Sequence, residues 1–434
     1  MARENAGDPT GQPVHPGATP RDLLFIALAF AAAVPWLVLR FQGAHPPPAL
    51  TAALTGLAIL GAAFMLSWAA EAFQKDVSQA LALALLALIA VLPEYAVDMV
   101  FAWKAAEDPT QAGYAVANMT GANRLLIGVG WSAIVLVAWL RFRAREVTME
   151  RSQAIEISVL LVATLYAFTI PFKDGLSLVD TGVFVALFAV YAWAAAKAPS
   201  HEPELVGPAH AIGELPPGRR RLATVGLFLF AAIAIFLSAE PFAEGLVETG
   251  LTFGIDEFLL VQWLAPLASE APEFLVAILF AWRGDAAAGM RTMVSSKVNQ
   301  WTLLVGTLPL VYSIALGRPG ALPLDHRQVE ELFLTSAQSL FAVVLIVTLS
   351  LTIRGGLALF VLFAAQLFIT WEPARWAFAF AYVILALAIL AFDASRRAAI
   401  FRLPREARAS LQGDPETEHL VHRADPSANP ARPD

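Results

Sequence analysis

The chain has 434 residues, of which 58% are apolar and 15% charged, with a formal net charge of −7 and a mean hydropathy of +0.63. Soluble domains carry about 25% charged residues, so this composition excludes an ordinary soluble protein and indicates one that crosses a membrane several times. Cysteine is absent, which excludes disulfides, thiolate metal sites and thiol redox chemistry. The histidines fall in predicted tails and loops, so we expect no buried histidine metal centre.

A polar tail opens the chain and is followed by a series of apolar segments. Residues 1–20 are rich in proline, glycine and charge and lack the apolar run of a cleavable signal, so we expect a disordered tail. A membrane-spanning helix needs about 20 apolar residues, and that length selects about 12 candidate transmembrane helices. They lie at 22–41, 49–70, 80–103, 112–140, 152–171, 179–196, 222–241, 256–282, 287–316, 332–352, 355–371 and 376–393. Residues 395–434 are predicted to form a second disordered tail.

Two of these segments exceed the length of a simple span, and a polar stretch divides the chain. The segments 112–140 and 287–316 are each predicted to contain a break, near Asn123 and near Asn299. The proline-rich residues 197–221 are predicted to form a cytoplasmic linker. This linker separates a first membrane half, 21–196, from a second half, 222–394.

Basic residues alternate between the predicted loops and set the topology. One set of loops holds Arg141, Arg143 and Arg145 and the run 219–221, whereas the opposite set is poor in Lys and Arg. The positive-inside rule therefore places both termini in the cytoplasm. We expect an integral membrane protein of a prokaryotic-type inner (plasma) membrane.

One motif occurs twice, in corresponding positions of the two halves. Pro93-Glu94 and Pro272-Glu273 each open an apolar run that ends in Phe-Ala-Trp and a basic residue. The predicted helix of Glu94 runs outward and that of Glu273 runs inward, so the repeats are inverted. The predicted fold is an all-α polytopic membrane protein, formed by an inverted repeat of two five-helix halves plus one peripheral helix at each end.

The repeat continues beyond the Pro-Glu helices. The residues that start at Ala112 align without gaps to those that start at Ala288, so that Asn123 falls on Asn299. Matching polar positions at matching depth are not explained by apolar composition alone.

A proline next to a carboxylate at membrane depth predicts a site for a hard cation. Proline frees the carbonyl four residues before it, and that oxygen needs another partner in lipid. Carboxylates within the membrane are costly and seldom lack a function. Glu94 and Glu273, each beside freed carbonyls, therefore predict an oxygen-rich site that suits sodium, calcium or protons.

These residues resemble the sodium/calcium exchanger superfamily of cation/calcium antiporters. The resemblance covers its two alpha repeats, at about 80–130 and 260–316, and the stretch from Asn118 to Asn123 is close to the family pattern Gly-Asn-x-x-Gly-Ser-Asn. It implies that Glu94 and Glu273 bind the cation at the midplane. The residues that resemble ligands from the second helix of each repeat are Asn118, Asn123, Ser295 and Asn299.

The chain also departs from the family pattern, and the departures concern charge. Glu270 and Ser269 precede the second Pro-Glu, Asp98 lies one helical turn after Glu94, and Lys297 aligns with Gly121. We name Glu270, Lys297, Asp98 and Ser269 as proton-coupling or charge-balancing candidates. One hypothesis pairs Lys297 with Glu270 and replaces a sodium site with a built-in cation. The alternatives are that Lys297 and Arg124 snorkel to headgroups, and that Asp98 pairs with a nearby cation.

The resemblance implies a secondary active antiporter that exchanges calcium or sodium for protons or another cation by alternating access. No cofactor is expected, and the expected partners are lipid and small cations, without nucleic acid or protein. One alternative is an intramembrane metal-dependent enzyme built on Glu270 and Glu273, although no histidine lies inside a confident span. Another is a transport-inactive repeat protein with a scaffold role.

Overall fold

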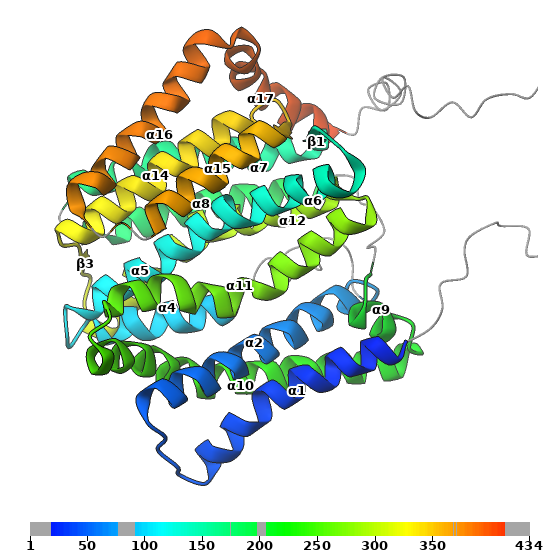
Figure 1. Cartoon of the computed structure of the whole chain (residues 1–434), viewed down its shortest axis with the longest axis vertical. Helices are drawn as coiled ribbons and strands as arrows, with labels where there is room; N and C mark the ends of the chain where they lie inside the picture. The colour runs from blue at the N-terminus through cyan, green and yellow to red at the C-terminus, as the bar shows by residue number, and fades with distance from the viewer. Residues whose placement is uncertain are drawn as a thin grey trace, which may run out of the picture.

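The computed structural model describes residues 19–76, 92–173, 175–197, 205–367, 369 and 371–412, and these form a helical bundle (Figure 1). The helical segments of the first half are α1 (Pro20–Phe41), α2 (Pro48–Phe73), α4 (Leu92–Lys104), α5 (Gln111–Leu125), η1 (Leu126–Trp131), α6 (Ser132–Phe142), η2 (Arg151–Gln153), α7 (Ala154–Ala167), η3 (Ile170–Phe172) and α8 (Leu178–Ala195). Those that follow are α9 (Pro208–Gly213), α10 (Pro217–Phe253), α11 (Glu257–Arg283), α12 (Ala286–Asn299), η4 (Gln300–Leu304), α13 (Val305–Leu316), α14 (His326–Ile346), α15 (Ile353–Leu367), α16 (Glu372–Phe392) and α17 (Ala394–Gln412).

Within the described residues, nine helices or continuous helical rods are long and apolar enough to cross a membrane. Each overlaps one of the predicted spans. The predicted span 355–371 corresponds to the shorter helix α15, and 287–316 corresponds to the rod from α12 to α13. The predicted span 80–103 begins outside the described residues, which cover it only from Leu92 onward. The protein is therefore an all-helical integral membrane protein.

The two rods that were predicted to break are continuous but irregular. A π-helical segment, η1, follows Asn123 by a few residues, and a second one, η4, begins directly after Asn299. A π-helical turn adds a residue to the turn and shifts the helix face without opening the backbone. The predicted positions were right, and the irregularity takes the form of a bulge instead of a gap.

Close backbone contacts join the second Pro-Glu helix, α11, to α5 and α12. Pro266 in α11 cannot donate a hydrogen bond to the carbonyl of Gln262. Gly121 of α5 lies against that carbonyl, and a Cβ at Gly121 would lie 1.8 Å from its oxygen. Gly289 similarly brings α12 against α11, because a Cβ there would lie 2.5 Å from the Ala277 oxygen. Glycine is required at both contacts.

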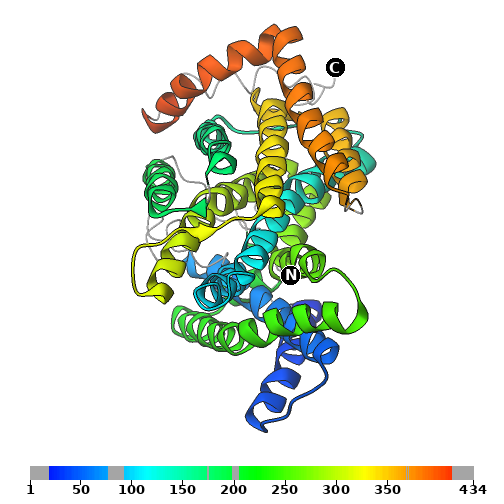
Figure 2. The same cartoon turned by 90° about the vertical axis from the view of Figure 1, so that its left-hand side faces the viewer.

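The apolar core is divided in two. A smaller cluster is formed by α1, α2, α9 and α10, at one end of the molecule in Figures 1 and 2. The larger cluster joins α4–α8 to α11–α17 and also includes residues of α2 and α10. The helices α4 and α11 belong to the larger cluster and contact α2 and α10 on one side and α5 on the other. The Pro-Glu helices therefore lie where the larger cluster meets α2 and α10, and we call this boundary the seam.

Two short antiparallel strand pairs connect loops of the first half to loops of the second. β1 (Glu146–Thr148) pairs with β4 (Ser350–Thr352), and β2 (Gly175–Leu176) pairs with β3 (Leu322–Pro323). The register places Val147 opposite Leu351. These pairs fix the second-half loops relative to the first half.

The predicted linker, 197–221, is partly helical, because it contains α9 and the first residues of α10. Arg220, in this first turn of α10, donates to both oxygens of Asp76 at 2.7 and 2.9 Å. The hydrogen bonds with Arg220 are the main cause that lowers the pKa of Asp76 to about 2; desolvation opposes them, and a hydrogen bond from Arg221 adds to them. The end of α2 and the start of α10 are therefore tied by charge.

The prediction of disorder from residue 395 was wrong as far as Gln412, because α17 covers that stretch. Arg396 donates to the carbonyl oxygens of Val344 and Leu345, at 2.6 and 2.5 Å, and so caps the end of α14. Leu403 is buried in the larger core. A few anchoring contacts are enough to hold a helix whose average composition is polar. Residues 413–434 and 1–18 lie outside the described residues.

Candidate cation site

Glu94 is a buried carboxylate at the start of α4. It follows Pro93 in the sequence, and only 1% of its surface is exposed. Neither carboxylate oxygen accepts a hydrogen bond from an amide, hydroxyl or amine of the described residues. A buried carboxylate without donors is costly, and a proton or a cation relieves that cost.

Two further carboxylates reach the same region from α11. Glu270 is buried and lies close enough to Glu94 for the two carboxylates to repel each other. Glu273 lies one turn further along α11, is half-buried, and interacts electrostatically with both. We refer to Glu94, Glu270 and Glu273 as the carboxylate cluster. Three such groups in an apolar bundle repel one another unless protons or a cation lie between them.

The cluster does not surround a common centre in this conformation. Within the part of the chain that the structure describes, no three Asp, Glu or His side chains are grouped as ligands of one metal ion. Glu270 instead accepts a hydrogen bond from the side-chain amide of Gln300. One oxygen each of Glu270 and Glu273 lacks a donor among the described residues. The arrangement therefore offers unused oxygen atoms close together.

Asp98 lies one turn from Glu94 on α4 and is fully buried. Its Oδ1 accepts a hydrogen bond from Nδ2 of Asn118 at 2.9 Å, and its Oδ2 has no donor in the described residues. The alternative that Asp98 pairs with a protein cation is not what the structure contains, because its partner is a neutral amide. Asn118 and Asp98 thus connect α5 to α4 beside the carboxylate cluster.

Lys297 is buried on α12, with 1% of its surface exposed. Its Nζ donates to Oδ1 of Asn123 at 2.7 Å and to the Asn123 carbonyl oxygen at 3.3 Å, and lies 4.3 Å from the centre of the Trp301 ring. The hypothesis that Lys297 pairs with Glu270 was therefore wrong, since Gln300 occupies that position. Snorkelling of Lys297 to the headgroups is also wrong, because its ammonium points into the bundle.

The other predicted ligands diverge. Oδ1 of Asn299 accepts from the hydroxyl of Tyr95, at 3.4 Å, next to Glu94. Ser295 instead lies near Glu156 of α7 and Tyr191 of α8, on another side of α12. The hydroxyl of Ser269 donates to carbonyl oxygens within its own helix, at 3.3 Å. In this conformation Ser295 and Ser269 do not contact the carboxylate cluster.

A buried ion network, which the sequence reasoning missed, lies on the far side of α5. Arg124 donates to Oε2 of Glu331 at 2.6 Å and lies 5.0 Å from the Trp263 ring. Arg375 of α16 pairs with both Glu330 and Glu331 of α14. Snorkelling of Arg124 is therefore wrong. The predicted span started at 332, so both glutamates were taken for loop residues. The signal that was available is the helix-capping pattern Asp325-x-x-Gln328.

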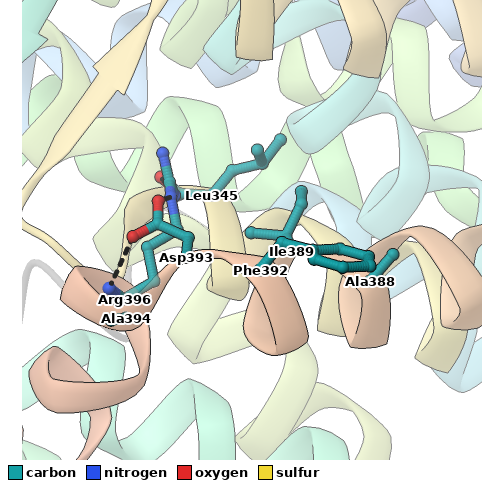
Figure 3. Close-up of a pocket in the computed structure, with 7 residues that line it drawn as sticks. All are labelled: Leu345, Ala388, Ile389, Phe392, Asp393, Ala394 and Arg396. Atoms are coloured by element: carbon teal, nitrogen blue, oxygen red, sulfur yellow. Dashed lines mark hydrogen bonds and ion pairs between the residues drawn. The ribbon is translucent and has the colours of Figure 1, made fainter.

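An open pocket at one end of the molecule is separate from the carboxylate cluster (Figure 3). It lies where α14, α16 and α17 meet, and its only acidic residue, Asp393, is paired with Arg396 at 3.2 Å. Its lining residues are Leu345, Ala388, Ile389, Phe392, Asp393, Ala394 and Arg396. It lacks the unpaired oxygens that a cation site needs.

Carboxylates buried in a membrane bundle are costly and mark ion or proton pathways. The chain matches the family model described as sodium/calcium exchanger protein over residues 48–197 and 223–372, which include both repeats. It therefore belongs to the sodium/calcium exchanger family, and the resemblance stated from the sequence is confirmed. The members of this family are cation/calcium antiporters, not enzymes, so the enzyme alternative is set aside.

Solved structures agree with this assignment. The crystal structure of the H+/Ca2+ exchanger CAX is 44% identical, with a TM-score of 0.86, over 91% of this chain and 100% of that one. Native YfkE is 18% identical, with a TM-score of 0.59, over 83% of this chain and 100% of that one. A structure of the sodium-calcium exchanger NCX_Mj is 18% identical, with a TM-score of 0.50, over 75% and 99%. The last two support the fold alone. No curated protein sequence matches the chain.

Proposed function

We propose that the chain exchanges calcium for protons across the membrane, and that the carboxylate cluster holds the two kinds of ion in turn. The observation that carries the proposal is that Glu94 is buried close to Glu270 and has no hydrogen-bond donor among the described residues. Similarity to an H+/Ca2+ exchanger at 44% identity supports calcium and protons over other ion pairs.

The chemistry of the exchange follows from charge. In the conformation described here, Glu94 and Glu270 are buried close to each other, and a proton between them would relieve their repulsion. Calcium needs six to eight oxygen ligands, which carboxylates, amides and water can supply together. When calcium enters, its two charges repel the protons from the cluster; when it leaves, protons return to neutralise the carboxylates. Each ion therefore drives off the other.

Alternating access would use the seam where α4 and α11 meet α2 and α10. The helices α2 and α10 pack closely, since a Cβ at Gly245 would lie 2.9 Å from the Ala52 nitrogen. With α1 they form a unit that has its own apolar cluster and lies against α11. Sliding of this unit along α4 and α11 would expose the carboxylates first to one side and then to the other. The inverted relation of the repeats, with both termini cytoplasmic in an inner membrane, is part of this proposal.

The test is calcium uptake into proteoliposomes with an acidic interior. We expect Glu94→Gln and Glu273→Gln to reduce proton-driven uptake at least about tenfold, because a neutral amide neither holds a proton nor balances calcium. Glu248→Gln is the matched control, since Glu248 is exposed on α10. Equal flux in wild type and Glu94→Gln would remove Glu94 from the mechanism.

A transport-inactive scaffold remains as the second candidate. It is favoured if neither calcium, sodium nor manganese changes the melting temperature of the purified protein, because a ligand that binds only the folded state must stabilise it.

A further inference from the structure

The ammonium of Lys297 occupies a place that is built for a cation. Two oxygen atoms of Asn123, one from the side chain and one from the backbone, lie at 2.7 and 3.3 Å from its Nζ. The face of the Trp301 ring closes the place on a third side, at 4.3 Å. Oxygen lone pairs and an aromatic face both attract positive charge.

The lysine is present in only one of the two repeats. The position that aligns with Lys297 in the first repeat is Gly121, where a Cβ would already meet the Gln262 carbonyl oxygen at 1.8 Å. A long side chain is therefore excluded in the first repeat and accommodated in the second. In the second repeat, Lys297 extends from α12 and places its ammonium against Asn123, near the end of α5.

We propose that Asn123 and Trp301 form a monovalent cation site which the tethered ammonium of Lys297 keeps filled, so that free sodium is excluded from it. An intramolecular ammonium has a high effective concentration and cannot dissociate. When Lys297 is protonated, the site adds a positive charge close to the carboxylate cluster. This inference rests on the proposed function, because it explains why protons and not sodium would be exchanged for calcium.

The test removes the ammonium of Lys297 by mutation and then supplies sodium as a free cation. Lys297→Met keeps the length of the side chain but leaves the oxygens of Asn123 without a cation. Melting temperatures of the purified protein are measured without calcium, in sodium chloride and in choline chloride at equal ionic strength. At ten times its Kd, sodium should raise the melting temperature of Lys297→Met by roughly 2 °C relative to choline. Wild type and Lys297→Arg, which keep a cation in place, should show no difference.

A folded Lys297→Met protein that is indifferent to sodium would overturn the proposal. If that variant does not fold, Lys297→Ala is purified with sodium or with methylammonium, either of which should refill the site. Failure of both variants to fold in both salts would also contradict the proposal.

The readout does not depend on transport. Sodium-dependent melting of Lys297→Met would therefore stand even if Glu94→Gln had normal flux and the proposed function failed. Conversely, calcium uptake by the wild type that is driven by a sodium gradient would refute the exclusion of sodium, while the inactivity of Glu94→Gln would still support the carboxylate cluster.

Discussion

The buried ion network around Glu331 allows a stability prediction that can be worked through from its contacts. Glu331 is fully buried and accepts from Arg124 with one oxygen and from Arg375 with the other, while Glu330 also pairs with Arg375. The four groups sum to zero charge. Glu331→Gln leaves two arginines with one carboxylate, and so leaves one positive charge uncompensated in the bundle.

Removing one partner of a buried ion pair costs about 3–5 kcal/mol, because the remaining charge stays out of water. We therefore expect Glu331→Gln to lower the free energy of unfolding by about that amount, measured by titration with SDS in mixed micelles. The matched control is Glu244→Gln, which breaks a half-exposed pair with Lys104 and should cost about 0–1 kcal/mol.

The double variant Arg124→Met with Glu331→Gln restores neutrality, since Arg375 keeps Glu330. Its loss should be smaller than that of Glu331→Gln alone, and the double-mutant cycle measures the difference. If Glu331→Gln loses less than about 1 kcal/mol, or if the double variant is less stable than either single one, the charge-balance reasoning is refuted.

Two further predictions concern helix packing and pH. Gly121→Ala should not fold in detergent, because its Cβ would lie 1.8 Å from the Gln262 oxygen. Gly182→Ala is the control and should fold normally, because, among the described residues, no atom of another helix lies within 4 Å of a Cβ there. Size-exclusion profiles of the two purified variants test this expectation. The pKa of Asp76 is lowered to about 2 by its hydrogen bonds with Arg220. The stability it contributes is therefore complete above about pH 4 and lost as pH falls toward 2. Asp76→Asn should be less stable at neutral pH and lose this acid dependence, and an unchanged pH profile of melting temperature would contradict the assignment.

The sequence was informative where a local rule decides the structure. Apolar length located nine of the spans, and the pairing of proline with glutamate at membrane depth identified Glu94 and Glu273. Whether these two carboxylates bind the transported ion stays a prediction. The polar positions Asn123 and Asn299 also marked where the helices become irregular. Each of these features depends only on the sequence of a single helix and on the lipid around it.

The partners of each side chain were less predictable, because they depend on which helix lies opposite. Lys297 and Gln300 are three residues apart on one helical surface, and either could reach Glu270. Only the packing of the rod α12–η4 against α11 and the rod α5–η1 directs Lys297 to Asn123 and leaves Glu270 to Gln300. Ser295 lies one turn before Asn299 but meets α7 and α8 instead of α4.

The strand pairs β1–β4 and β2–β3 have a consequence for how the molecule flexes. The membrane-spanning helix α7 lies between β1 and β2 in the chain, so the two strand pairs lie at opposite ends of the membrane helices in the larger cluster. Because both strand pairs link the two halves of the chain, we expect them to resist sliding between the helices of the larger cluster. The unit of α1, α2 and α10 is then the part that moves most easily. A binder that links α2 to α11 should consequently block the sliding proposed above, whichever side of the membrane it binds from.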